Sequence, residues 1–212
     1  MADRGDTVAR SYTLTRRSVK DVEVSSLAPQ RPRFMREFAE SSDYILEPAW
    51  RGTRALVRTA QPSSAVGYDG AVVEAPRELL DAIRAMTSAD DAILDGIFVE
   101  GFVDESELEP GASADEAFIR RSAPRSVFVA VDLLEVDGIS LLEVPLLERK
   151  RHLAATLQPS QNVRLTPFVR RGFRAWRETL EAQGFREYVV KRVNSRYRPG
   201  ETNEDWLQVQ KL

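Results

Sequence analysis

The clearest fold signal in the chain is the stretch Glu47-Pro48-Ala49-Trp50-Arg51-Gly52-Thr53-Arg54-Ala55-Leu56-Val57-Arg58. Its pattern predicts two strands, at residues 44–47 and 54–59, around a turn at Trp50-Arg51-Gly52. A glutamate ends the first strand and an arginine begins the second, so charged side chains are expected close to this turn.

Outside this stretch, periodicity predicts helices and strands in mixed order. The expected helices cover residues 76–86, 145–157 and 173–182, with a short one at 114–121 after an acidic loop at 105–114. The expected strands cover residues 91–103, 127–136, 163–169, 188–193 and 205–212. Short turns connect these elements, which favours an α+β fold with mainly antiparallel sheet. In the helix at 145–157, the leucines are expected inside and Glu148, Arg149, Lys150 and Arg151 outside.

Composition excludes several classes of protein. The 212 residues contain no cysteine, which rules out disulfides, thiolate zinc sites and a cysteine nucleophile. No apolar run reaches about 18 residues and no secretory signal begins the chain, so we expect no membrane association and a cytoplasmic location. The net charge of −3 is not typical of a nucleic-acid-binding protein. Only four of the 30 basic residues are lysines, so few amines could act as nucleophiles.

Four further blocks follow the opening stretch in a fixed order. Together with it they resemble the adenylation domain of ATP-dependent DNA ligases, over residues from about Pro29 to Leu212. The family patterns are Glu-Pro-Lys-Trp-Asp-Gly-x-Arg-Ala, Leu-Asp-Gly-Glu, Phe-Asp-Leu-Leu with Pro-Leu-x-x-Arg, Gly-x-Glu-Gly-Val-Val-x-Lys-Arg, and Trp-Leu-Lys-Val-Lys. The matching blocks here are residues 47–58, 91–96, 128–149, 184–200 and 206–210.

The resemblance implies a fold and a domain organisation. The fold is α+β, with two mainly antiparallel sheets flanked by helices, as in the nucleotidyltransferase (ATP-grasp-like) fold of DNA ligases and mRNA capping enzymes. The expected domain covers residues 27–212, after a mobile N-terminal arm at 1–26. The family's OB-fold domain, which follows the last block and clamps DNA, is expected to be absent.

The chain departs from the family at the reactive positions. The lysine that attacks the α-phosphate of ATP is replaced by Ala49, and the following aspartate by Arg51. The remaining changes concern acids, phosphate-binding lysines and the aromatic residue that stacks on adenine. They are Ile97, Val131, Arg186, Glu187, Gln208 and Gln210. The retained residues are Glu47, Gly52, Arg54, Asp95, Gly96, Asp132, Lys191 and Trp206.

These changes affect every requirement of adenylyl transfer. The reaction needs an amine nucleophile, carboxylates that hold a divalent metal, and cations over the developing phosphate charge. With alanine as residue 49, we predict no catalytic residue and a catalytically inactive pseudo-ligase. Because Arg51 and Arg186 each replace an anion by a cation, a divalent metal is not expected, while ATP is a candidate ligand.

The same changes predict a cationic site. If the family fold holds, Arg51, Arg54, Arg186 and Lys191 converge on one cleft, and guanidinium groups suit phosphate oxygens. With Glu47 and Asp95 they form the predicted nucleotide- or phosphate-binding set. The alternative is that these cations form structural ion pairs, with partners among Glu47, Asp95, Asp132 and Glu187.

Three functions follow from this interpretation. The first is binding of a nucleotide, of DNA or of a DNA-repair protein without catalysis. The second is a protein-interaction scaffold whose cleft is filled by Ile97, Val131 and neighbouring apolar side chains. The third is an active DNA ligase or adenylyltransferase that uses Lys191, or a partner protein, in place of the missing lysine. The sequence does not decide whether the protein is an enzyme.

Overall fold

The computed structural model describes residues 27–100 and 126–211. The predicted arm at 1–26, the acidic loop at 105–114 and the short helix at 114–121 lie outside the described residues. The described elements are β1 (Arg31–Glu37), β2 (Tyr44–Pro48), β3 (Thr53–Arg58), β4 (Ser64–Val66), α1 (Arg77–Ala85), β5 (Ala92–Val99), β6 (Val127–Val136), β7 (Ile139–Ser140), α3 (Leu146–Thr156), β8 (Val163–Leu165), α4 (Phe173–Ala182), β9 (Tyr188–Arg192) and β10 (Thr202–Lys211).

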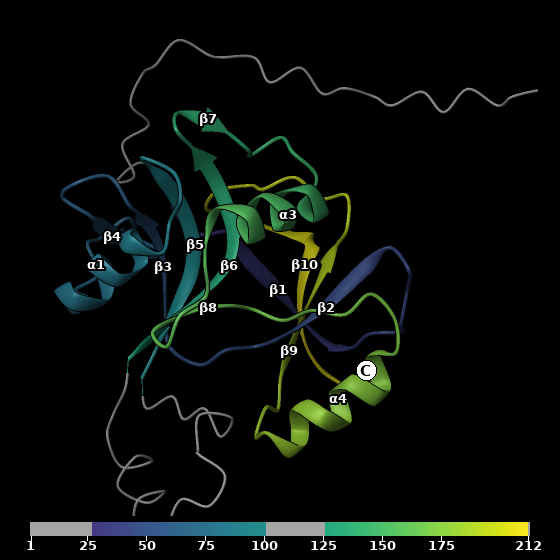
Figure 1. Cartoon of the computed structure of the whole chain (residues 1–212). Helices are drawn as coiled ribbons and strands as arrows, with labels where there is room; N and C mark the ends of the chain where they lie inside the picture. The colour runs from purple at the N-terminus through teal and green to yellow at the C-terminus, as the bar shows by residue number, and fades with distance from the viewer. Residues whose placement is uncertain (1–26, 101–125, 212) are drawn as a thin grey trace, which may run out of the picture.

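These elements form two sheets, as predicted (Figure 1). The four-stranded sheet has the order β1-β10-β9-β2, and the larger sheet has the order β4-β3-β5-β6-β7 with β8 on β6. Only the pairs β1–β10 and β6–β8 are parallel among the paired strands described. The consecutive strands β2 and β3 belong to different sheets, so the turn at 50–52 carries the chain from one sheet to the other.

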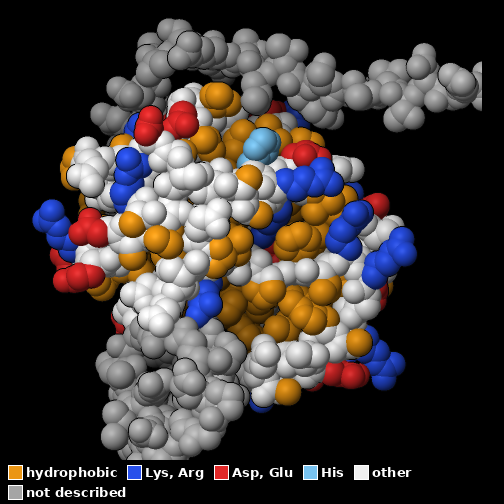
Figure 2. Space-filling view, in the orientation of Figure 1, with side chains coloured by type: hydrophobic (Ala, Val, Ile, Leu, Met, Phe, Trp, Pro, Cys, Tyr) orange, Lys and Arg blue, Asp and Glu red, His pale blue; other side chains and the backbone are white. Residues whose placement is uncertain are grey.

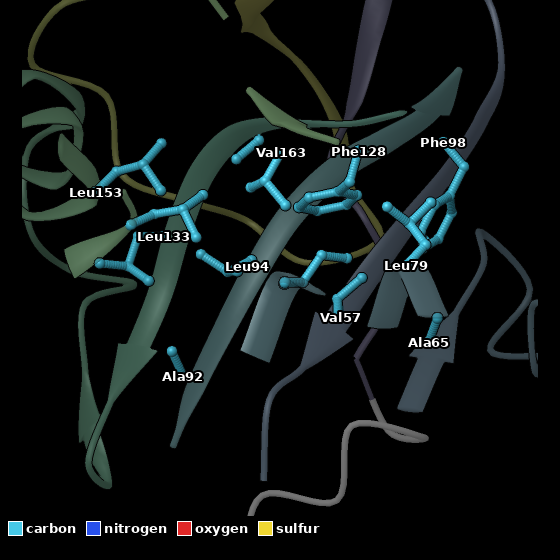
Figure 3. Close-up of a cluster of buried hydrophobic side chains, with 14 of the residues drawn as sticks. Val57, Ala65, Leu79, Ala92, Leu94, Phe98, Phe128, Leu133, Leu153 and Val163 are labelled. Atoms are coloured by element: carbon cyan, nitrogen blue, oxygen red, sulfur yellow. The ribbon is translucent and has the colours of Figure 1, made fainter. Parts of the chain in front are cut away.

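The main core lies against the larger sheet. Side chains of β3, β5 and β6 pack there with Leu79 and Ile83 of α1 and Leu153 of α3 (Figure 3). Nine of the ten residues of β6 are buried, which agrees with its nearly unbroken apolar sequence. Gly96 permits the close packing of β5 on β6, because a Cβ there would lie 2.2 Å from the Phe128 ring.

A second cluster covers the outer face of the four-stranded sheet. Phe173 and Leu180 of α4 pack there on Leu46, Val190 and other apolar residues of β2, β9 and β10. Helix α4 follows its predicted amphipathic pattern and coincides with the predicted range of 173–182. Because this face is occupied by α4, the opposite face of the four-stranded sheet is left to look toward the larger sheet.

None of the helices in the described ranges could cross a bilayer, since the longest has 11 residues and a spanning helix needs about 20. The prediction for residues 163–169 was too long: β8 ends at Leu165, and only an isolated bridge joins Val169 to Leu46. Strand β1 was not predicted. It pairs with β10, near the other end of the chain.

Candidate ligand-binding cleft

An open cleft of about 480 Å³ lies between the two sheets. It is large enough for a small-molecule ligand. Residues of β1, β2, β3, β5, β6, β9 and β10 line it, together with the turns at 49–52 and 67–69. The lining residues are Pro32, Glu47, Pro48, Ala49, Trp50, Arg51, Gly52, Thr53, Arg54, Gly67, Tyr68, Asp69, Val73, Ile97, Val131, Glu187, Val189, Lys191, Trp206 and Gln208.

Strand alternation decides which side chains reach the cleft. In β9, Val189 and Lys191 line it, whereas Tyr188 and Val190 face the cluster beneath α4. Trp206 lies opposite Lys191 and Gln208 lies opposite Val189 in β10. Residues directly opposite each other share a face of the sheet, so the cleft side of β10 carries Trp206 and Gln208.

This alternation corrects the prediction for Arg186. The side chain of Arg186 is exposed and does not line the cleft. Its Nη1 donates to the backbone oxygens of Glu181 (3.1 Å) and Phe185 (3.0 Å). Glu187 lines the cleft instead, because it has the same strand parity as Val189 and Lys191. The predicted convergence therefore includes Arg51, Arg54 and Lys191 but excludes Arg186.

One buried carboxylate and two ammonium groups form an ion-pair cluster at the base of the cleft. Glu47 Oε2 lies 2.8 Å from Lys191 Nζ, and Glu47 Oε1 contacts Lys150 Nζ. All three side chains are at most 5% exposed. Burial would raise the pKa of Glu47, but Lys150 and Lys191 outweigh it and hold this pKa below its usual value.

Burial is the main influence on the pKa of Lys191, whose charged neighbours are two cations and two carboxylates. Burial, with repulsion from Lys150 and Arg54, lowers the pKa of Lys191 to about 8, although Glu47 acts in the opposite direction. Its Nζ lies 3.9 Å from the centroid of the Trp206 ring, an arrangement typical of a cation–π contact. Lys191 is therefore held in place by Glu47 and Trp206 while it lines the cleft.

Arg54 and Asp95 form a second pair. Arg54 Nε and Nη2 donate to the two oxygens of Asp95 at 2.5 and 2.7 Å, and Tyr197 Oη donates to Asp95 Oδ2 at 2.8 Å. Burial would lower the pKa of Arg54, but Asp95 outweighs this effect and raises it. Asp95 itself is fully buried and does not line the cleft, so this residue supports Arg54 from below.

Arg51 differs from the other cleft cations. It is exposed on the turn between β2 and β3, beside Ala49, and no ion pair or hydrogen bond of its side chain is formed within residues 27–100 and 126–211. Thus two of the cations in the cleft form structural pairs, as the alternative prediction held, whereas Arg51 is available to a ligand.

Two basic residues of α3 were wrongly predicted to lie outside. Arg149 is fully buried and Lys150 is 6% exposed. Arg149 Nε and Nη2 donate to Asp132 Oδ1 (3.0 Å) and Oδ2 (2.8 Å). Arg149 and Lys150 follow Leu146 by three and four residues and precede Leu153 by four and three, so helical spacing places both on the buried side of α3. The prediction placed them outside because they are charged. Lys150 belongs to the site but was missing from the predicted set.

Glu187 and Gln208 also line the cleft, and Gln210 contacts Glu187 beside it. Glu187 accepts hydrogen bonds from Gln208 Nε2 (2.7 Å) and Gln210 Nε2 (3.2 Å). Both glutamines occupy positions where the ligase pattern has lysine. We call these three residues the acid–amide cluster.

Each acid that lines the cleft has a partner within the protein. Glu47 is bound by two lysines, Asp69 accepts from the backbone N–H of Ala71, and Glu187 accepts from amide groups. The described residues contain no group of three or more His, Cys, Asp or Glu side chains arranged to hold an ion. Cations and N–H donors therefore already engage each of these carboxylates and compete with a divalent metal for its oxygens.

The apolar residues of the cleft line its wall without filling it. Ile97 is 6% exposed and Val131 is 3% exposed, and both border the open volume. The filled cleft that the scaffold interpretation requires is therefore not observed. Apolar side chains are exposed on the surface between α3 and α4, with Lys and Arg side chains around them (Figure 2).

Comparisons with known proteins agree with this architecture, although no family model matches the chain. A DNA ligase of Thermococcus fumicolans is 23% identical over 213 residues, which cover 85% of this chain and 36% of that protein. A DNA ligase of Methanothrix thermoacetophila is 30% identical over 145 residues, which cover 64% and 26%. The chain thus spans about a quarter to a third of the length of these relatives.

Solved structures show the same fold. The ligase domain of Mycobacterium tuberculosis LigD superposes with a TM-score of 0.64 at 23% identity, covering 88% of this chain and 60% of that one. A mycobacterial DNA ligase D complexed with ATP and MES gives the same score and identity, covering 89% and 61%. The predicted resemblance and the predicted nucleotidyltransferase fold are both confirmed.

Proposed function

We propose that this DNA ligase-like chain is a catalytically inactive pseudo-ligase that binds nucleotide or nucleic-acid phosphates in its cleft. The carrying observation is Arg51: an arginine without an anionic partner among the described residues faces an open cleft, directly beside Ala49. Guanidinium groups form charge-assisted hydrogen bonds with phosphate oxygens. Alanine offers no amine at the position of the ligase nucleophile. The cleft therefore supports phosphate binding but not covalent transfer through residue 49.

A binding measurement tests the role of Arg51. We expect Arg51→Ala to weaken binding of ATP, nicked duplex DNA or single-stranded DNA, whichever the wild type binds, by about tenfold, because one charge-assisted contact is lost. Isothermal titration calorimetry on each ligand gives the affinities. Arg174→Ala is a matched control, since Arg174 is 85% exposed on α4 and does not line the cleft. Absence of binding above background for all three ligands in the wild type would contradict the proposal.

The competing function is adenylylation at Lys191, which the lowered pKa of its amine favours. A deprotonated amine is nucleophilic. However, the side chain is pinned by Glu47 at 2.8 Å and by the Trp206 ring. The acids around it do not fit the divalent metal that the reaction uses.

A labelling experiment separates the two functions. We expect no covalent label after incubation with α-labelled ATP and magnesium, in either the wild type or Lys191→Ala. An acid-labile label on the wild type that disappears in Lys191→Ala would establish an adenylyltransferase and end the pseudo-ligase proposal. An active DNA ligase labelled in parallel controls for the reagents.

A further inference from the structure

We infer that the cleft takes a nucleic-acid strand and rejects free nucleoside triphosphates, with the acid–amide cluster of Glu187, Gln208 and Gln210 as its selectivity element. This inference rests on the proposed function, because it requires that the cleft binds phosphate groups. The inference adds which phosphate compounds enter the cleft, a nucleic-acid strand or a free nucleoside triphosphate.

The charges of the side chains that line the cleft balance one another. The ionisable side chains that line the cleft are three cations and three anions. They are Arg51, Arg54, Lys191, Glu47, Asp69 and Glu187. The residues paired with them from below, Asp95 and Lys150, also cancel each other. A triphosphate concentrates several negative charges on one ligand, whereas a strand carries a single charge on each phosphodiester. A neutral cleft with one available arginine matches the single charge.

Glu187 places a negative charge at the border of the cleft. Its carboxylate borders the cleft and is fixed by amide donors from two residues of the neighbouring strand. Amides leave the negative charge of Glu187 in place, whereas lysines at residues 208 and 210 would neutralise it. An anion held at the border of the cleft repels additional phosphate groups. The amide oxygens of the two glutamines can accept hydrogen bonds from bases.

An exposed aromatic residue lies beside this cluster. Phe34 of β1 lies opposite Gln208, which lies opposite Val189, which in turn lies opposite Glu47. Residues in such a row share one face of the sheet, so Phe34 extends the cleft face outward to the edge strand. Phe34 is 56% exposed, so its ring is accessible to a ligand.

A second aromatic residue lies on the same side. Tyr68 lines the cleft and is 37% exposed, and the Arg31 guanidinium lies over its ring at 5.1 Å. Exposed rings beside arginines are typical of sites where successive bases stack. A mononucleotide inside the cleft would not use Phe34 at the edge strand. A strand would place a phosphodiester at Arg51 and bases along Tyr68 and Phe34.

Competition binding tests the selectivity. We expect the wild type to bind a fluorescent single-stranded oligodeoxynucleotide, and ATP to compete at least about tenfold more weakly than the unlabelled strand. Glu187→Lys should raise the affinity for ATP by about tenfold, because it replaces a repelling charge by a phosphate-binding one. Glu178→Lys is the matched control, because this substitution makes the same charge change away from the cleft. Glu178 lies on α4, with its side chain 62% exposed.

Two further variants test the inference independently of Glu187→Lys, which could fail to fold. One tests the exclusion of ATP and the other tests binding of the nucleic-acid strand. Gln208→Lys adds a cation beside Glu187 without removing the acid, and should also improve binding of ATP. Phe34→Ala should weaken the strand about fivefold to tenfold through loss of one stacked base, but leave AMP unchanged. Val72→Ala, which removes another exposed apolar side chain that does not line the cleft, should alter neither ligand.

The outcomes distinguish this inference from the proposed function. If ATP binds the wild type as tightly as the strand, or if Glu187→Lys and Gln208→Lys both leave ATP binding unchanged, the selectivity is refuted and the proposed function stands. If Phe34→Ala leaves strand binding unchanged, the assignment of a strand is refuted. If neither ATP, AMP nor the strand binds the wild type, the proposed function fails and the inference fails with it.

Discussion

Replacing Arg149 by alanine is expected to lower the free energy of unfolding by about 3–5 kcal/mol, because it leaves the buried carboxylate of Asp132 without its cation. Both side chains are fully buried. Arg149 Nη1 also donates to the backbone oxygens of Val144 (2.6 Å) and Ser195 (3.0 Å), so the residue ties α3 to β6 and to the loop after β9. Guanidinium chloride denaturation, followed by circular dichroism, measures the loss.

The same helix offers a matched control. Arg151 pairs with Glu148 at the surface, with its own side chain 72% exposed, so Arg151→Ala should cost less than about 0.5 kcal/mol. The double variant Arg149→Met/Asp132→Leu should be more stable than Arg149→Ala, because it removes both buried charges together. A loss below about 1 kcal/mol for Arg149→Ala would contradict the buried pairing as described.

Replacing Glu47 by glutamine is expected to cost a similar amount at neutral pH, about 3–5 kcal/mol. The amide cannot compensate the buried ammonium groups of Lys150 and Lys191, both of which contact the carboxylate in the wild type. Urea denaturation of the two proteins at pH 6 gives the difference in free energy of unfolding.

The size of this loss should depend on pH. The pKa of Lys191 is about 8 in the folded wild type and about 10.4 in an unfolded chain. Between these values the unfolded chain binds a proton that the folded chain has released, so stability rises with pH. Without Glu47 the pKa of Lys191 falls further, because an attraction that raises it is lost. Burial and the Lys150 and Arg54 cations then act with only Asp132 opposing them.

The loss caused by Glu47→Gln should therefore be smaller at pH 9 than at pH 6, since the wild-type Lys191 has by then given up most of the charge that Glu47 attracts. Adding Lys191→Met to Glu47→Gln should recover part of the stability at pH 6. An equal loss at the two pH values would show that Lys191 stays charged throughout, and the account of its pKa would be wrong.

Much of the fold could be predicted from the sequence. Helix α4, strand β6 and the turn between β2 and β3 agree with their predicted ranges. In each case the signal is local, because amphipathic or apolar periodicity reports which face of an element is buried. Strand β1 was not predicted, because its sequence has little alternation of apolar and polar residues and its partner β10 comes from the opposite end of the chain.

The meeting of Ala49, Arg51, Ile97, Val131 and Lys191 in one cleft was also predictable, because the order and spacing of the ligase-like blocks specify which strands adjoin. The sequence did not predict that Glu187 lines the cleft and that Arg186 does not. A shift of one residue along a strand moves a side chain to the other face, and block alignment does not resolve where the strand alternation begins.

Residue types, block order and helical or strand periodicity were enough to identify a ligase-like framework, with alanine at residue 49. They could not show that Arg149 and Lys150 are buried, or that Glu47 is shared by two lysines while Arg51 is left without a partner among the described residues. The physical reason is that a charge becomes a structural pair or an available ligand contact according to the neighbours that folding brings to it. For these side chains, those neighbours come from distant parts of the chain.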